Sequence, residues 1–204
     1  RVIETGEDVA VKVLRPGIER AFRKDIDAFY FAAGMIEWLL PSTRRLRPGD
    51  VIAHFDSVVQ GELDLRMETA AAAEFAANTE NDTGFRVPRP LWHLSGRRVM
   101  TLGWAEGVPL GDNAAIDALG VDRPELATRV LRLFLQHAMR DGFFHGDMHQ
   151  GNLKVAANGD IIAYDFGIMG HIDEYSRRVY AEILFGFIRK DYRRVAEVHF
   201  EAGY

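Results

Sequence analysis

FFHGDMHQGNLKV, at Phe143–Val155, and IIAYDFG, at Ile161–Gly167, are the two stretches that decide the fold of this chain of 204 residues. Their apolar segments at 153–155 and 161–164 flank Asn158-Gly159, a dipeptide typical of tight hairpin turns. The pattern therefore predicts a β-hairpin that stands between Asn152 and Asp165.

The polar residues around this hairpin have the spacing that phosphoryl transfer requires. That chemistry needs a carboxylate near the nucleophile and hard oxygen ligands for Mg²⁺. Asp147 would orient or deprotonate the attacking hydroxyl or water, while Asn152 and Asp165 would hold Mg²⁺ against the phosphates. An Asp, an Asn and an Asp-Phe-Gly in this order are the kinase signature set, so we expect ATP and Mg²⁺ as cofactors.

A second interpretation of the same loop is a metal site formed by His145, Asp147 and His149. Alternate residues of an extended loop could share one side. His-x-Asp-x-His is not a common structural zinc spacing, and it leaves Asn152 and Asp165 without a role. We therefore favour the kinase-like interpretation.

Upstream, VAVKVL at Val9–Leu14 predicts a strand that carries Lys12. A lysine among apolar residues needs a partner, and this strand matches the one whose lysine contacts nucleotide phosphates in kinases. The alternative is an edge-strand lysine that points to solvent. The candidate partners are four acidic residues on a helix predicted over 50–78, namely Glu62, Asp64, Glu68 and Glu74. The alternative is that these residues form a solvated acidic stripe on the helix.

The remaining pattern predicts an α+β, two-lobed, protein-kinase-like fold with a helix-rich C-terminal lobe. We expect a partial N-lobe over 1–102, a hinge over 103–111 and a helical C-lobe over 112–204. The further predicted elements are helices over 18–40, 124–141, 173–190 and from 191, strands over 87–94 and 97–102, and a basic loop over 42–50. In the hinge, Gly103, Trp104 and Ala105 would offer backbone groups to an adenine edge, and the alternative for Trp104 is a core or interface aromatic.

The composition narrows the functional classes. The chain has no cysteine, which excludes disulfide frameworks, thiolate nucleophiles and Cys-ligated zinc. Its net charge of −5 argues against nucleic acid as a partner. The apolar stretch Phe29–Leu40 is shorter than the roughly 20 residues of a membrane span. We expect this stretch in the core, with contact to a bilayer as the alternative because Arg44–Arg47 is basic.

Several of these segments together resemble the UbiB/ADCK family, which consists of atypical protein-kinase-like proteins linked to ubiquinone (coenzyme Q) biosynthesis. The resemblance covers Val9 to about Gly203 and rests on VAVKVLRPGI, ELDLRMETAAAAE at Glu62–Glu74, FHGDMHQGN and DFG. It implies ATP binding with slow Mg²⁺-dependent hydrolysis. It also implies site roles: an ion pair of Lys12 with Glu68, a Glu-x-Asp motif near the phosphates at Glu62 and Asp64, a catalytic-loop Asp147, and metal ligands Asn152 and Asp165.

The sequence departs from the family pattern at several points. Gly146 and Gln150 replace the alanine and proline of the usual catalytic loop, and Gly103 stands where the hinge usually has an acidic residue. The family's Lys-x-Gly-Gln motif and alanine-rich nucleotide loop would lie before Arg1, and the membrane anchor of bacterial members is absent. We therefore expect a fragment whose kinase-like fold is incomplete at the N-terminus.

The resemblance also implies partners and a location, namely membrane lipid or quinone precursors, ubiquinone-pathway enzymes, and the cytoplasmic side of the bacterial inner membrane. Two other functions stay open. His145-Gly146-Asp147 with Asn152 also fits a small-molecule phosphotransferase of the aminoglycoside or choline kinase type. A nucleotide-binding pseudokinase scaffold would contain the same ligands without turnover.

Overall fold

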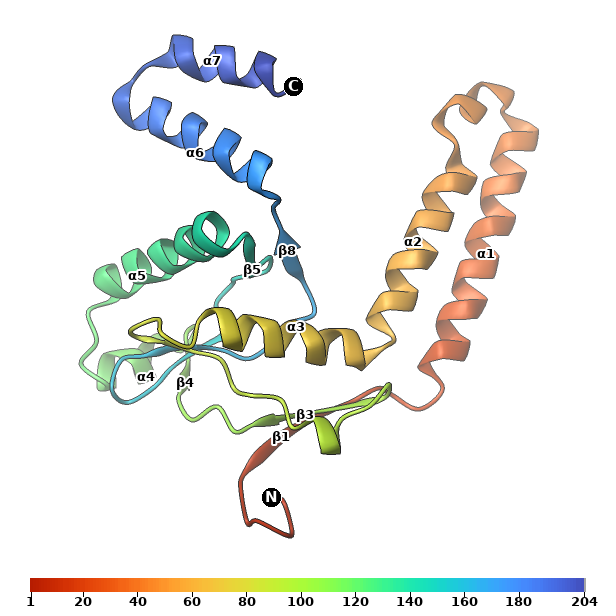
Figure 1. Ribbon diagram of the computed structural model, residues 1–204. Helices are drawn as coiled ribbons and strands as arrows, with labels where there is room; N and C mark the ends of the chain where they lie inside the picture. Colours follow the sequence, from red (N-terminus) through yellow and green to blue (C-terminus); the bar gives the residue numbers. More distant parts are fainter. Residues whose placement is uncertain (204) are drawn as a thin grey trace. The chain divides into compact units, whose positions relative to one another are not determined.

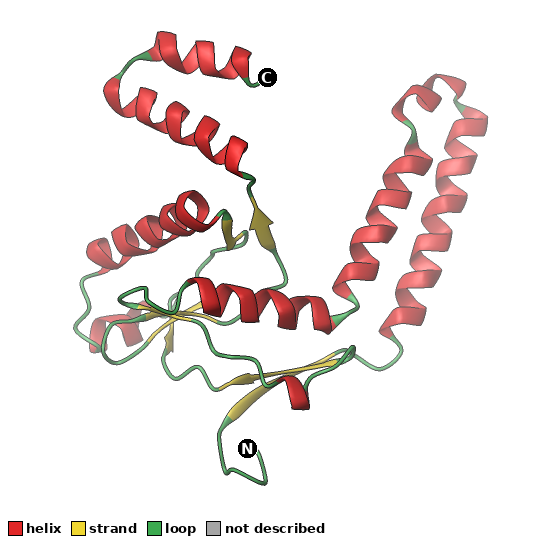
Figure 2. Cartoon of the chain, in the orientation of Figure 1, coloured by secondary structure: helices red, strands yellow, loops and turns green. Residues whose placement is uncertain are grey.

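The computed structural model describes residues 1–203, which divide into two units (Figure 1). Unit 1 comprises Arg1–Ala73 and Arg89–Trp104, and unit 2 comprises Glu74–Pro88 and the chain from Ala105 onwards. Helix α3 contains the boundary, so it contributes residues to both units. The mixture of helices and strands is the α+β class that the sequence predicted (Figure 2).

Unit 1 is built on a two-stranded antiparallel sheet and a pair of long helices. Its elements are β1 (Val9–Val13), α1 (Ile18–Leu39), the 3₁₀ helix η1 (Pro41–Leu46), α2 (Pro48–Glu62), the start of α3 (Leu65–Asn78), the 3₁₀ turn η2 (Trp92–Leu94) and β3 (Val99–Gly103). Strands β1 and β3 pair from Val9↔Gly103 to Val13↔Val99, which sets Lys12 opposite Met100. Helices α1 and α2 pack against each other, with Phe29 edge-on to Phe55.

The single helix predicted over 50–78 is wrong, because the structure breaks it at Leu63 and Asp64. Asp64 ends the break as the capping residue of α3, since its Oδ1 accepts the backbone N–H of Arg66 at 3.1 Å. The strong helix formers around the break concealed it from a propensity argument. The basic loop over 42–50 is also wrong in part, since Pro41–Leu46 forms η1 and α2 begins at Pro48.

The core role expected for Phe29–Leu40 is wrong for most of the stretch. Ile26 and Ala33 are the buried residues of α1, whereas Phe31 is 71% exposed and Trp38 is 74% exposed. Within residues 1–203, no helix is long and apolar enough to cross a membrane.

Unit 2 contains the two other sheets and the later helices. Its elements are the end of α3, β2 (Phe85–Arg86), β4 (Val108–Pro109), α4 (Asn113–Ala118), α5 (Arg123–Gln136), the π turn η3 (His137–Asp141), β5 (Phe143–His145), β6 (Leu153–Val155), β7 (Ile161–Ala163), β8 (Met169–His171), α6 (Glu174–Arg189) and α7 (Tyr192–Glu201). One sheet has the order β2-β7-β6-β4, and β5 pairs with β8. The predicted hairpin is confirmed, because β6 and β7 are antiparallel with Leu153 opposite Ala163.

The strand predicted over 87–94 is wrong. Only Phe85–Arg86 forms a strand there, and Trp92–Leu94 is a 3₁₀ turn. Pro88 and Pro90 fall within the predicted strand and have no backbone N–H to donate to a ladder, which explains the failure. The strand predicted over 97–102 is confirmed as β3, displaced to Val99–Gly103.

The helix predicted over 124–141 is α5 followed by the π turn η3, and it ends at Gly142 as expected. Gly142 has φ 68°, and a Cβ there would lie 2.5 Å from the carbonyl oxygen of Ile172. Both observations require glycine at this helix end. This glycine therefore fixes the turn into β5, the strand that leads into the loop over 145–152.

Phe75 of α3 is fully buried at the centre of unit 2. Its ring meets Phe85, Phe143 and Phe166 edge-on, with centroids 5.7, 6.0 and 6.3 Å away. Phe166 belongs to the Asp-Phe-Gly stretch and also contacts the ring of His145 at 6.2 Å. The buried aromatic cluster therefore holds the residues adjacent to Asp165 and Asp147 in place.

Candidate active site

Lys12 forms an ion pair with Glu68 inside unit 1. Its Nζ lies 2.6 Å from Oε1 and 2.9 Å from Oε2 of Glu68. Successive side chains of a strand point to opposite faces of its sheet. Glu68 lies in the first turn of α3, where the helix dipole favours an anion. The Lys12 side chain is half exposed and that of Glu68 is nearly buried, so the ammonium can still meet a ligand. Of the four acidic candidates, Glu68 is thus the one that the structure pairs with Lys12.

Asp64 is committed to a different partner. The Arg66 guanidinium donates to both of its carboxylate oxygens, at 2.6 to 3.3 Å, and this hydrogen bonding holds the pKa of Asp64 at about 2. Asp64 therefore stays ionised at any physiological pH. Glu62 ends α2 and is exposed to solvent, two residues before the cap.

The hinge residues make backbone contacts of their own. The N–H of Gly103 donates to Arg89 O and that of Trp104 to Asp8 O, both at 3.1 Å. The carbonyl of Ala105 accepts the Lys154 ammonium at 3.0 Å. These bonds occupy three of the backbone groups that an adenine edge could use. Trp104 is 58% exposed, which excludes the core role considered for it.

The loop over 145–152, which we call the Asp147 loop, is closed by hydrogen bonds from its own residues. Asn152 Nδ2 donates to the Asp147 backbone oxygen at 3.0 Å and to Asp147 Oδ2 at 3.1 Å. The buried His145 accepts the Asp147 N–H on Nδ1 at 3.1 Å. Burial lowers the pKa of His145, so its imidazole stays neutral and keeps this acceptor available.

Asn152 and Asp165 lie at the same end of the β6–β7 hairpin. Asn152 directly precedes β6, and its carbonyl accepts the N–H of Tyr164, which directly precedes Asp165. The Asn152 amide nitrogen is occupied by Asp147, so the amide oxygen is the atom of this side chain that could ligate a metal ion. Asp165 Oδ1 accepts the N–H of Gly167 at 3.1 Å, which fixes the carboxylate. An amide oxygen and a carboxylate at one hairpin end fit Mg²⁺ completed by phosphates and water.

The alternative metal site finds no support in the geometry. Among residues 1–203, no three histidine or acidic side chains gather closely enough to hold a metal ion. His149 instead approaches Asp147 alone, with Nε2 3.3 Å from Oδ2.

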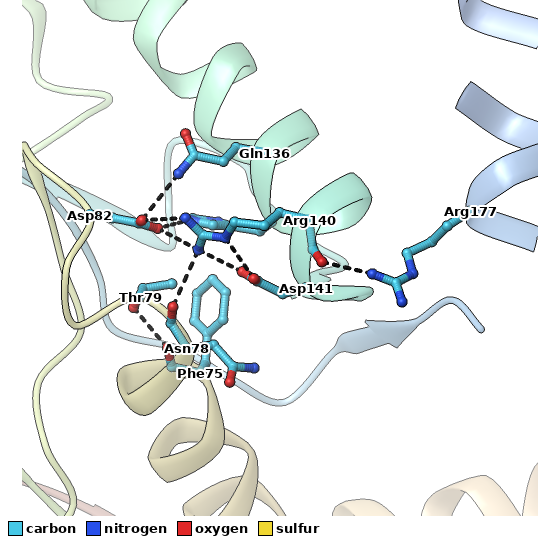
Figure 3. Close-up of polar contacts among 9 residues, drawn as sticks. Phe75, Asn78, Thr79, Asp82, Gln136, Arg140, Asp141 and Arg177 are labelled. Carbon is cyan, nitrogen blue, oxygen red and sulfur yellow. Dashed lines mark hydrogen bonds and ion pairs between the residues drawn. The ribbon is translucent and has the colours of Figure 1, made fainter. Parts of the chain in front are cut away.

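A polar cluster around the buried side chain of Asp82 was missed by the sequence analysis (Figure 3). Asp82 follows α3 and accepts hydrogen bonds from Gln136, His137 and Arg140 at 2.6 to 3.0 Å. Arg140 also binds both oxygens of Asp141 and the carbonyl of Asn78, and its own carbonyl accepts Arg177 of α6. We call these residues the Asp82 cluster; they join the end of α3, the π turn and α6.

An apolar cavity of about 520 Å³ adjoins the Asp147 loop within unit 2. Met148 and Gln150, on either side of His149, form one wall, and helices α4 and α5 form the others. Most of the lining is aliphatic or aromatic, including Ile116, Leu126 and Phe134.

Comparison with known proteins identifies the family. A family model, described as the ABC1 atypical kinase-like domain, matches residues 1–199. A Marinobacter nauticus protein named "Probable protein kinase UbiB" is 37% identical over 206 residues, and a Xanthomonas campestris pv. campestris protein of the same name is 38% identical over 203 residues.

The alignments take in nearly all of this chain but only part of each relative. They cover 99% and 97% of this chain, against 38% and 36% of the two relatives. A solved structure from Mycobacterium tuberculosis, described as the complex of Rv3197 with erythromycin, matches with a TM-score of 0.76 at 26% identity. That match covers 97% of this chain and 49% of the other.

Proposed function

Because this chain belongs to the ABC1 atypical kinase-like family and is similar to UbiB proteins, we propose that it binds ATP with Mg²⁺ and hydrolyses or transfers the γ-phosphate in support of ubiquinone biosynthesis. The observation that carries the proposal is the hairpin end where Asn152, Asp165 and the Asp147 loop lie together. This arrangement supplies a carboxylate for the acceptor and oxygen ligands for the metal.

In the proposed reaction, Asp147 orients the acceptor oxygen, which is that of water or of a hydroxyl. A bond forms from this oxygen to the γ-phosphorus, the bond from the γ-phosphorus to the bridging oxygen of ADP breaks, and the acceptor proton passes to Asp147. Bound at Asn152 and Asp165, Mg²⁺ would neutralise charge on the phosphates.

Lys12 is proposed to contact the phosphates, while the ion pair with Glu68 holds the Lys12 side chain in position. Asp64, held ionised by Arg66, and the exposed Glu62 are proposed to act near the same phosphates. Gly103 and Ala105 are proposed to flank the adenine.

The test is hydrolysis of ATP by the full-length protein with and without Mg²⁺. Asp165→Asn removes the anionic ligand and should lower Mg²⁺-dependent hydrolysis about 100-fold. Asp117→Asn, an exposed position on α4, is the matched control and should leave the rate unchanged. Unchanged hydrolysis in Asp165→Asn would disprove the metal assignment, and ATP binding without turnover in the wild type would indicate a pseudokinase scaffold.

A small-molecule phosphotransferase is the second candidate, favoured by the apolar cavity next to the Asp147 loop. A similar solved structure is described as a complex with erythromycin, so erythromycin belongs in the screen together with choline and aminoglycosides. Mass spectrometry would detect a gain of one phosphoryl group on the acceptor. Efficient phosphorylation of any of them would replace the ubiquinone proposal.

We also propose that the protein acts at the cytoplasmic side of the bacterial inner membrane, with lipid, quinone precursors or pathway enzymes as partners. The support is the α1–η1 segment, where exposed Phe31 and Trp38 precede the basic residues Arg44, Arg45 and Arg47. Flotation with liposomes rich in anionic lipid should recover the protein, and Trp38→Ser should reduce the recovered fraction. Equal recovery on neutral and anionic liposomes would contradict the charge argument.

A further inference from the structure

His149 has no role in the proposed reaction as described so far, yet other residues of its loop contact its ring. Its Nδ1 accepts the backbone N–H of Gly151 at 2.9 Å. A nitrogen that accepts an N–H carries no proton of its own, so the proton of the neutral imidazole is on Nε2. Nε2 lies 3.3 Å from Asp147 Oδ2, so the ring edge that carries this proton is in close electrostatic contact with the carboxylate.

The absence of a side chain at Gly151 makes this ring position possible. A Cβ at Gly151 would lie 2.6 Å from Cε1 and 2.9 Å from Nδ1 of His149. The backbone of Gly151 does not have the positive φ that itself demands glycine. The glycine is therefore required because the imidazole ring occupies the space of a Cβ. An alanine at this position would displace the ring without straining the backbone.

Asn152 and His149 approach the Asp147 side chain at the same oxygen, Oδ2. Asn152 Nδ2 lies 3.1 Å from Oδ2, and His149 Nε2 lies 3.3 Å from it. The Asp147 side chain is 42% exposed, so packing alone does not hold its rotamer. With Oδ2 engaged by these two contacts, Oδ1 is the carboxylate oxygen to which we assign the acceptor.

We propose that His149 is a positioning residue, which through the close contact of its Nε2 with Oδ2 holds the Asp147 carboxylate so that Oδ1 faces the acceptor. This inference rests on the proposed phosphoryl-transfer function and adds to it a requirement for His149 and Gly151 together. Misplacement of a reacting group by a fraction of an ångström to one ångström lowers turnover by one to two orders of magnitude.

Steady-state ATP turnover by the full-length protein tests the proposal. His149→Ala should lower kcat about 10-fold and change KM for ATP less than about twofold, because Asp147 acts on the acceptor. His149→Gln, whose amide can still donate to Asp147, should retain most of the activity. Gly151→Ala should reproduce His149→Ala, and the double variant should be no worse than either single variant. His54→Ala, at an exposed position of α2, is the matched control.

Wild-type kcat in His149→Ala, an equal loss in His149→Gln, or additive losses in the double variant would overturn the inference. Failure of the proposed function is distinguishable, since the wild type itself would then show no Mg²⁺-dependent turnover. In that event ¹⁵N NMR of the His149 ring decides the positioning claim. An Nε2–H tautomer that is lost in Gly151→Ala supports it, and an Nδ1–H tautomer in the wild type contradicts it.

Discussion

At the scale of single residues, Asp82 shows what local sequence patterns do not reveal. The stretch Asn81–Gly84 predicts a turn and forms one, but a turn-forming role gives no hint of distant partners. Gln136, His137 and Arg140 reach Asp82 from more than fifty positions away. A possible signal was the spacing of His137 and Arg140, which places both on one side of the turn before the Asp147 loop.

Asp82→Asn should destabilise the protein by about 3 kcal/mol, because it leaves the buried ring of His137 and the guanidinium of Arg140 facing a neutral amide. The Asp82 side chain is 5% exposed, so water cannot replace the lost interactions. Asp117→Asn breaks only an exposed ion pair with Arg123 and should cost less than about 1 kcal/mol. Equal midpoints for the two variants in urea unfolding would contradict the buried role.

The same cluster should make the protein sensitive to acid. Burial lowers the pKa of His137, whose neutral ring donates to Asp82. Burial raises the pKa of Asp82, but hydrogen bonds from Arg140 and His137 more than offset this, and the net pKa lies below its usual value. The unfolded chain therefore binds more protons than the folded chain below about pH 6.5.

Stability should consequently fall as the pH drops from about 6.5, first through His137 and then, near and below the usual pKa of aspartate, through Asp82. Thermal unfolding measured between pH 4 and 8 checks this. Asp82→Asn removes the partner that raises the pKa of His137, so it should strengthen the loss of stability between about pH 6.5 and 4. A wild-type midpoint that does not change with pH would contradict the account.

At the scale of elements, the sequence predicted those whose signals are contiguous. The β6–β7 hairpin has an Asn-Gly turn between apolar segments, and the end of α5 and η3 has its glycine. The break between α2 and α3 was missed because good helix formers surround it, and only the capping bond of Asp64 reveals it. The exposed apolar face of α1 was misassigned because periodicity does not tell which partner covers a helix.

The hinge lies so close to β6 that Gly107 admits no side chain. A Cβ there would be 2.6 Å from the carbonyl oxygen of Val155, a backbone atom of a buried strand that cannot yield. Gly107→Ala should therefore destabilise unit 2 by about 1–3 kcal/mol. Gly34→Ala in α1, where nothing lies within 4 Å of the added methyl group, should instead stabilise by up to about 1 kcal/mol. Thermal unfolding compares the two, and equal midpoints would contradict the close approach.

At the scale of the whole molecule, each unit contains its own group of proposed functional residues. Lys12 and Glu68 pair within unit 1, while Asp147, Asn152 and Asp165 belong to unit 2. The motifs predicted the members of each group, because their spacing in the sequence is local or follows the family pattern. The choice of Glu68 over three other acids came from the resemblance, since helix periodicity alone left all four open.

The central claim is the proposal that the protein binds Mg²⁺-ATP, with Lys12 as a phosphate contact and Asp165 as a metal ligand. The most direct test is labelling of the full-length protein with a lysine-reactive acyl-phosphate derivative of ATP, followed by mass spectrometry. We predict that Lys12 is labelled in preference to Lys24 and Lys190, that excess Mg²⁺-ATP protects it, and that Asp165→Asn reduces the labelling. Labelling of Lys12 that equals that of Lys24 and Lys190, or that neither Mg²⁺-ATP nor Asp165→Asn changes, would contradict the claim.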